Sequence, residues 1–393
     1  MNEAVLVDCV RSPIGKGKPG GALSGIHSVD LLSQTLLGLL SRTGIDPGRV
    51  EDVVTGCVSQ AGEQSGNVGR MAWLAAGLPE HVPAVTVERK CGSSQQALHF
   101  AAAGIMAGQY DVVVVAGVES MSRVPMGCAR LGADPAGPTV TARYSPGLVS
   151  QGVAAELVAA RWKITREQLD DYAARSHRLA GEAADSGGFE PEIVPITLPD
   201  GTVVNRDETI RRGTTTAVLS ALPTVFNDEA VARRFPEISW SITAGNSSQI
   251  TDGASALLIT SERAATQLGL TPRARFGGFA VCGDDPIAML TAPIPATRRL
   301  LERAGLGIDD IDHYEVNEAF ASVPLAWQSA FDADPERLNA RGGAIALGHP
   351  LGASGARLAT TMLGALEASG GRLGLQTMCE AGGMANALLL ERL

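Results

Sequence analysis

Short aliphatic runs with strand character alternate with segments of helical periodicity along the first 120 residues. The aliphatic runs are rich in valine and lack the three-to-four residue spacing of an amphipathic helix. The segments between them place apolar residues on one helical face, as Leu31, Leu32, Leu36, Leu39 and Leu40 do. The pattern predicts strands over 3–10, 52–58, 84–88 and 111–117, and helices over 29–42, 66–76 and 95–106.

Two of these elements are apolar on every side. Residues 111–117, D-V-V-V-V-A-G, show no polar alternation, which is typical of a parallel strand covered on both faces. The preceding helix, A-L-H-F-A-A-A-G-I-M-A, is apolar nearly all round and is therefore expected between layers. We interpret His99 within it as a core histidine.

The pattern changes between residues 121 and 244. Loops rich in glycine, proline and threonine, such as 126–152, alternate with charged amphipathic helices, such as 165–184, which begins with the capping-like T-R-E-Q. Loops of this length inside a compact protein usually cover a binding site. We expect an inserted loop or lid domain here.

The α/β pattern then returns in an order that matches the first part of the chain. A shift of 261 residues lays helix 91–107 on 352–368 and strand 112–118 on 373–379 without gaps. This predicts an α/β protein of two duplicated halves, residues 1–120 (completed by about 245–270) and 271–393, around a loop domain at 121–244. Equivalent turns of the halves would then share one cleft. The expected C-terminal elements are strands over 256–260, 274–281, 311–316, 373–379 and 385–391, and helices over 295–304 and 355–368.

Composition narrows the possible partners. The chain has 393 residues, 45% of them hydrophobic and 19% charged, and a net charge of −10, which argues against nucleic acid or an anionic membrane surface as a partner. The six cysteines are scattered without metal-binding spacing, so we expect neither a metal site nor a disulfide framework. The chain shows no targeting presequence and no apolar run long enough for a membrane span, which favours a cytoplasmic protein.

Cys91 stands where a strand runs into a helix. The unpaired NH groups and the positive dipole end of a helix lower the pKa of a cysteine, so Cys91 is a candidate nucleophile. The alternative is a small apolar residue at a strand–helix joint.

Three C-terminal segments add polar groups that suit the same chemistry. They are V-N-E-A-F-A from Val316, R-G-G-A-I-A-L-G-H-P-L-G-A-S-G-A-R from Arg341, and M-C-E-A-G-G-M from Met378. Taken singly, Asn317 is also explained as a helix cap, His349 as a loop histidine and Cys379 as a buried apolar residue. Taken together, they supply an amide donor, a base and a second thiol for Cys91.

These segments resemble the thiolase family, which includes 3-ketoacyl-CoA thiolase and acetyl-CoA acetyltransferase. The resemblance covers nearly the whole chain, through V-R-S-P-I-G-K, C-G-S-S-Q-Q-A, A-G-V-E-S-M-S, T-A-G-N-S-S, N-E-A-F-A and G-H-P-L-G-A-S-G. It implies a five-layered αβαβα fold of two like halves with a lid-like loop domain, assembled as a homodimer or homotetramer. It also implies coenzyme A and acyl-CoA as substrates, with no permanently bound cofactor.

The resemblance assigns a role to each catalytic group. Cys91 would be the acylated nucleophile, activated as a thiolate by His349, and Cys379 would protonate the leaving enolate and then deprotonate the incoming CoA thiol. His349 and a water held by Asn317 would form one oxyanion hole, and the backbone NH groups of Cys91 and Ala381 the other. The residues implied to contact substrate or CoA are Ser248, Arg211, Ala319 and Phe320.

The favoured reaction is thiolytic cleavage of a 3-ketoacyl-CoA to acetyl-CoA and a shortened acyl-CoA. The alternatives are acetoacetyl-CoA formation by the same fold and, from another class, a non-catalytic binder of lipid or acyl-CoA. The chain departs from the family pattern at Ala381, at 150–152, at 222–226 and at 289–293, where the acyl group or the lid is expected, so the acyl group stays open.

Overall fold

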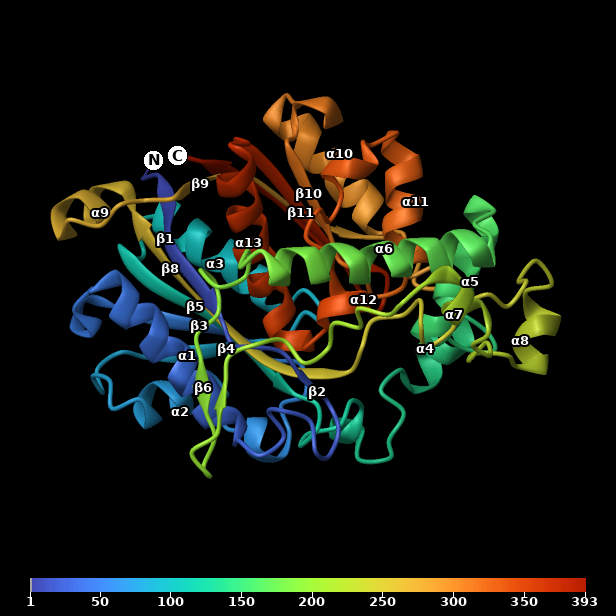
Figure 1. Ribbon diagram of the computed structural model, residues 1–393, viewed down its shortest axis with the longest axis horizontal. Coiled ribbons are helices and arrows are strands. Elements are labelled where there is room, and N and C mark those ends of the chain that lie inside the picture. The colour runs from blue at the N-terminus through green and yellow to red at the C-terminus, as the bar shows by residue number, and fades with distance from the viewer. Residues whose placement is uncertain (1) are drawn as a thin grey trace.

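Two sheet halves with the same strand pattern form the centre of the molecule (Figure 1). The computed structural model describes residues 2–393. The halves join where β1 pairs with β9 through Val5–Arg275 and Leu6–Ala274. In hydrogen-bonded order, the first half contains β1 (Ala4–Arg11), β8 (Thr251–Ser261), β5 (Val112–Ser120), β3 (Asp52–Gly56) and β4 (Ala84–Val87), and the second contains β9 (Ala274–Gly283), β12 (Met384–Arg392), β11 (Leu373–Glu380) and β10 (His313–Val316).

The strand directions confirm the predicted duplication. In each half the first three strands are antiparallel neighbours and the next strand is parallel to the third. The sequence shift also holds, since β3 begins at Asp52 and β10 at His313, while β5 begins at Val112 and β11 at Leu373. The two halves are therefore structural repeats.

Helices complete the five layers. α3 (Ser93–Met106) and α13 (Leu351–Ser369) pack on each other and on strands of both halves, so they form the middle layer. α1 (Ser28–Thr43) and α2 (Val68–Ala75) cover the outer face of the first half. α10 (Pro293–Ala304) and α11 (Ser322–Phe331) cover the outer face of the second half. The predicted αβαβα arrangement is confirmed.

The middle layer is apolar because it contacts a sheet on each side. Leu98 and Ile105 of α3 and Met362 and Leu363 of α13 belong to one buried cluster between the sheets. Burying one such side chain fully stabilises the fold by about 1.5–3 kcal/mol. His99 is buried too and stacks on Phe279 with ring centroids 5.0 Å apart, as expected for a core histidine.

A glycine at the start of α13 sets how closely the middle layer approaches the first sheet half. A Cβ atom at Gly352 would lie 2.6 Å from Val118 O and 2.7 Å from Gly56 O. Any side chain there would collide with backbone, so only glycine allows this approach.

The segment between β5 and β8 crosses both halves. α5 (Gln151–Trp162) packs on α11 and α6 (Arg166–Asp185) packs on α12 (Ala344–Leu347), whereas β6 (Ile196–Thr197) packs on α1. The T-R-E-Q sequence forms the predicted capping box at the start of α6, between Thr165 and Gln168. The domain division at 120 and 244 remains a prediction. The elements of this segment are α4 (Gly137–Arg143), α5 (Gln151–Trp162), α6 (Arg166–Asp185), β6 (Ile196–Thr197), β7 (Val203–Val204), α7 (Thr216–Ser220) and α8 (Glu229–Arg234).

Several boundaries differ from the predicted ones. α13 begins at Leu351 rather than at 355, because its glycines pack against backbone instead of breaking the helix. β8 begins five residues early, at Thr251, and α2 begins only at Val68, after Asn67 caps it. No element was predicted at β2 (Gly15–Lys16), α9 (Glu262–Leu268) or α12. Among residues 2–393, no helix combines the length and the apolar character that a bilayer span requires.

Candidate active site

Cys91 lies in a tight turn between β4 and α3. Gly92 N donates to Arg89 O over 3.1 Å, and Ser93 N donates to Lys90 O over 3.1 Å. The Ser93 hydroxyl oxygen accepts from Arg89 N at 3.0 Å and so closes the turn from inside. Only 4% of Cys91 is exposed, because Leu351 and Met378 pack against it. The turn therefore fixes the thiol in a dry environment.

This environment reverses the predicted effect on the thiol. Burial first, and then the nearby Glu380 carboxylate, raise the pKa of Cys91 to about 12. The backbone NH group at the helix terminus does lower this pKa, but the expected net decrease is wrong because the overall shift is upward. Desolvation of the thiolate outweighs the favourable backbone NH groups, since the turn is covered by β11 and its neighbours.

His349 is held in one tautomer by the start of α13. Ser354 Oγ donates to Pro350 O over 2.8 Å, so it accepts from His349 Nδ1, which lies 2.6 Å away. The ring proton is therefore on Nδ1, and the lone pair is on Nε2. Asn317 Nδ2 lies 3.4 Å from this Nε2 atom.

The imidazole is neutral at pH 7. Burial, and then the charge of Arg357, lower the pKa of His349 to about 3. The predicted thiolate at Cys91 is thus replaced by a neutral thiol and a neutral base. Proton transfer has to accompany the attack of the sulfur on a substrate carbonyl.

The second thiol reaches the same place from β11. Cys379 is paired with Ala385 of β12, and the next residue, Asn386, donates from Nδ2 to Gly92 O over 3.2 Å. The pKa of Cys379 is raised well above its usual range by burial and then by Cys91. The structure therefore pairs Cys91 with Cys379 and Asn317 with His349, and Leu351, which packs against Cys91, follows His349 by two residues.

The side chain of Asn317 and the backbone NH group of Ala381, both predicted for the oxyanion holes, are compatible with this geometry. Asn317 Oδ1 is buried and has no hydrogen-bond partner among the described residues, so it is free to accept from a bound water or ligand. The left-handed residues after Cys379 are Gly382 and Gly383, with φ of 93° and 77°. Ala381 lies before them and needs no positive φ, so its NH group is compatible with an alanine.

The predicted substrate-binding residues form two groups. Ser248 N donates to Ala319 O over 2.9 Å, and Ser247 bridges to Phe320, so three of these residues come together beside Asn317. Arg211 is exposed, and its Nη2 donates over 3.3 Å to Oε1 of Gln249, the residue after Ser248.

Gln249 connects the segment of Arg211 to the backbone of His349, and the sequence pattern did not indicate this role. Its Nε2 atom donates to Thr209 O and Ile345 O, each over 3.0 Å, and its carbonyl accepts from His349 N at 3.1 Å. It thus ties the Arg211 segment to the backbone of the base. The only sequence signal is its position directly after T-A-G-N-S-S.

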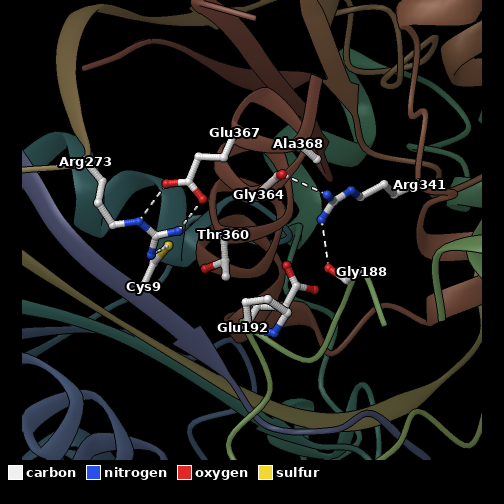
Figure 2. Close-up of a pocket in the computed structure, with 10 residues that line it drawn as sticks. Cys9, Gly188, Glu192, Arg273, Arg341, Thr360, Gly364, Glu367 and Ala368 are labelled. Carbon is white, nitrogen blue, oxygen red and sulfur yellow. Dashed lines mark hydrogen bonds and ion pairs between the residues drawn. The ribbon is translucent and has the colours of Figure 1, made fainter. Parts of the chain in front are cut away.

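A separate cavity of about 370 Å³ lies between β1, α13 and the segment after α6 (Figure 2). None of the four predicted catalytic residues lines it. Its arginines are engaged in the fold: Arg273 pairs with Glu367 over 2.7 Å, and Arg341 donates to the carbonyls of Gly188 and Gly364. Because these arginines connect neighbouring segments of the chain, we interpret the cavity as a structural gap between segments and not as the reaction site.

Comparison with known proteins agrees with this geometry. The family model "Thiolase, N-terminal domain" matches residues 4–263, and "Thiolase, C-terminal domain" matches residues 270–392. The chain is 48% identical to the steroid 3-ketoacyl-CoA thiolase FadA6 of Mycobacterium tuberculosis over all of this chain and 95% of that protein. It is 44% identical to the 3-ketoacyl-CoA thiolase of Vibrio vulnificus, with each chain fully covered. The crystal structure of the Bacillus anthracis acetyl-CoA acetyltransferase superposes with a TM-score of 0.90 at 36% identity, covering 100% of this chain and 99% of that one. Two family models that together span nearly every residue, and relatives this similar along their whole length, show that the chain belongs to the thiolase family.

Proposed function

We propose that the protein cleaves 3-ketoacyl-CoA thiolytically, giving acetyl-CoA and a shortened acyl-CoA. The observation that supports this proposal is a set of buried contacts around the start of α13: Asn317 lies 3.4 Å from His349, and Leu351, two residues after His349, packs against Cys91. Cys91 in turn lies close enough to Cys379 to raise the pKa of that thiol. A nucleophile, a base and a second thiol are the groups that two proton transfers and one acyl transfer require.

The first half-reaction begins with a neutral pair. His349 Nε2 takes the proton of Cys91 while the sulfur attacks C3 of the substrate. The C2–C3 bond then breaks, its electron pair leaves as the enolate of acetyl-CoA, and Cys379 protonates C2. The acyl group stays on Cys91 as a thioester.

The second half-reaction returns both thiols to their starting state. The Cys379 thiolate takes the proton of CoA, whose sulfur attacks the acyl-Cys91 thioester. The acyl-CoA departs and the Cys91 sulfur recovers its proton from His349.

Negative charge on substrate oxygen needs donors at both steps. We assign His349 and a water on Asn317 to one oxygen, and the NH groups of Cys91 and Ala381 to the other. Losing one such donor typically slows a reaction about 100- to 1000-fold.

The degradative direction is favoured over acetoacetyl-CoA formation by the names of the relatives at 44–48% identity. The condensing direction uses the same four residues and is the second candidate, because the similar solved structure is an acetyl-CoA acetyltransferase. A non-catalytic binder is disfavoured, since binding alone gives no reason for two buried thiols beside a base.

We further propose a bulky apolar acyl group. A cleft of about 430 Å³ opens between the start of α5 and the segment before α8. Its lining combines apolar side chains, including Leu148, Val149, Val153 and Phe226, with the polar side chains of Ser150, Asn227, Asp228 and Arg234. Phe226 meets Phe320 edge to face, with ring centroids 6.0 Å apart, which connects the cleft to the motif that carries Asn317. A cleft of this size accommodates a long or ring-bearing acyl group.

Self-association is the third part of the proposal. β4 is the outermost strand of its sheet half and exposes 45% of Val85, and Phe100 on the neighbouring α3 is 51% exposed. An open edge with apolar side chains favours pairing with a second copy of the same strand.

Cys91→Ser is expected to abolish acyl-enzyme formation and to lower the thiolysis rate at least about a thousandfold, because the hydroxyl is a far weaker nucleophile. Intact-mass spectrometry after incubation with acetoacetyl-CoA checks this. An acyl adduct retained on another residue would contradict the assignment.

Cys379→Ala is expected to keep acylation of Cys91 by acetyl-CoA while losing carbon–carbon bond cleavage and formation. The mass of the acyl-enzyme and the rate of thiolysis are measured on the same preparation. Equal loss of both half-reactions would contradict the division of roles between the two thiols.

A series of 3-ketoacyl-CoA substrates tests the acyl group. We expect kcat/KM for a long-chain or ring-bearing substrate to exceed that for acetoacetyl-CoA, because the larger group fills the cleft, and Phe226→Ala to reduce this preference. A preference for acetoacetyl-CoA of more than about tenfold would contradict the proposal, since one methylene in a pocket changes specificity by a factor of that order or more.

Light scattering tests self-association. The wild-type protein is expected at a multiple of the 40.6 kDa chain mass, and Val85→Asp at a lower mass, because two buried like charges would face each other across the edge. A monomeric wild-type protein would contradict this proposal without affecting the reaction.

A further inference from the structure

Glu380 is a buried acid that touches the turn of the nucleophile. It is the last residue of β11, directly after Cys379, and its relative exposure is 0%. A Cβ atom at Gly92 would lie 2.0 Å from Glu380 Oε1, so the carboxyl group fills the space that a side chain at Gly92 would occupy. Neither carboxyl oxygen has a hydrogen-bond partner among residues 2–393. A buried carboxylate in this position would be uncompensated.

Asn386 places a second hydrogen-bond acceptor beside Gly92. Its Nδ2 atom donates to Gly92 O over 3.2 Å. A backbone carbonyl only accepts, so the amide orientation is fixed and Oδ1 points away from Gly92 O. Asn386 Oδ1 lies 2.7 Å from the same Cβ position that Glu380 Oε1 approaches, and it also lacks a donor in the described part of the chain. Two acceptors that converge in this way need a hydrogen between them.

We propose that Glu380 is a positioning residue that works in its neutral acid form: its O–H donates to Asn386 Oδ1, and Asn386 Nδ2 in turn holds the Gly92 carbonyl and with it the Cys91 turn. The inference rests on the proposed thiolytic function, because it concerns the nucleophile of that reaction. Loss of the Glu380 proton breaks the chain of hydrogen bonds and places a negative charge beside the thiols.

The surroundings favour the acid form. Burial raises the pKa of Glu380 to about 8; Arg89 lowers it by less, and Glu88 raises it. Both charged neighbours lie on the segment between β4 and α3. From α3 itself, His99 is neutral, because burial and Arg89 lower its pKa to about 3. β12 presents the neutral amide of Asn386.

The ionised form would oppose catalysis directly. A charge on Glu380 raises the pKa of Cys91 and also that of Cys379. In the proposed reaction Cys379 becomes a thiolate, and the Cys91 sulfur gains negative charge as its proton leaves for His349. Activity that depends on the Glu380 proton therefore declines as the pH rises through about 8.

The same proton is linked to folding. Glu380 titrates near its ordinary value of 4.5 in the unfolded chain and near 8 in the native state. The native state thus binds more protons between these values, and the contribution of Glu380 to stability decreases as the pH rises across this window. Glutamine at this position keeps a donor and has no proton to lose.

The test compares wild type, Glu380→Gln and Glu380→Ala in three measurements from pH 6 to 9.5: thiolysis, alkylation of Cys91 by iodoacetamide, and thermal unfolding. For Glu380→Gln we expect thiolysis near the wild-type rate at pH 6.5 without the decline above pH 8. The alkylation rate of Glu380→Gln relative to wild type should rise from about 1 at pH 6.5 to about tenfold at pH 9.5, since a contacting charge shifts a pKa by one unit or more. Its Tm relative to wild type should rise from pH 6 to about pH 8 and then stay level, because the linkage ends at the native pKa.

Glu380→Ala is the matched control, because it removes the donor as well as the charge. We expect its thiolysis to fall about tenfold or more at every pH, since Asn386 Oδ1 is left without a donor. Equal rates for the alanine and glutamine variants would overturn the positioning role. A ratio of alkylation rates that stays flat with pH, together with a flat difference in Tm, would overturn the assignment of the acid form.

Failure of the inference is distinguishable from failure of the proposed function. Alkylation and unfolding need no acyl-CoA, so they report on Glu380 even if the wild-type protein shows no thiolysis. Wild-type thiolysis with flat ratios contradicts the inference alone.

Discussion

The close approach of α13 to α3 and to the first sheet half is the constraint on which the site depends. A Cβ atom at Gly355 would lie 2.3 Å from Gln95 N, and one at Gly352 would meet the backbone of β3 and β5. Gln376 of β11 then bonds to Gln95 and to Gly355 O, so the three elements are fixed together. Cys91 precedes α3 and His349 precedes α13, and their relation follows from this contact. Larger residues here would separate the nucleophile from its base by moving whole helices.

Burial decides the electrostatics of the site. Desolvation is the largest effect that keeps the Cys91 and Cys379 thiols protonated and His349 neutral. The neighbouring charges have smaller effects on these pKa values. Charge then arises only while the reaction proceeds. In a low-dielectric site each aligned NH group interacts more strongly with that transient charge than it would in water.

The sequence predicted what depends on periodicity. The valine runs, the all-apolar helix and the 261-residue shift predicted a strand covered on both faces, a helix between layers and the duplication, because these features follow from local pattern and element order. The five-layered arrangement came from the family resemblance. The meeting of Cys91 with His349 and Cys379 followed from the duplicated turns together with the family motifs. Their protonation states did not follow, because they depend on what covers the turn.

Long-range contacts account for what the sequence could not supply. The amide of Asn386 reaches Gly92 across 294 residues, and nothing local to either residue indicates it. Gln249 and Ser354 are likewise ordinary polar residues until the fold places them against the backbone and ring of His349. The start of α13 was misplaced for a related reason: its glycines suit helix packing here, whereas in isolation they indicate a loop.

The shared middle layer also has a consequence for how the protein matures. α3 is apolar on nearly all sides because the second half covers the face that the first half leaves bare. A chain that has formed only its first half would carry this helix, and the adjoining Cys91 turn, open to water. The thiol would then titrate as an ordinary cysteine and be open to indiscriminate oxidation. Docking of the second half buries it, and the same event delivers Asn317, His349 and Cys379, so protection of the nucleophile and its catalytic competence begin together.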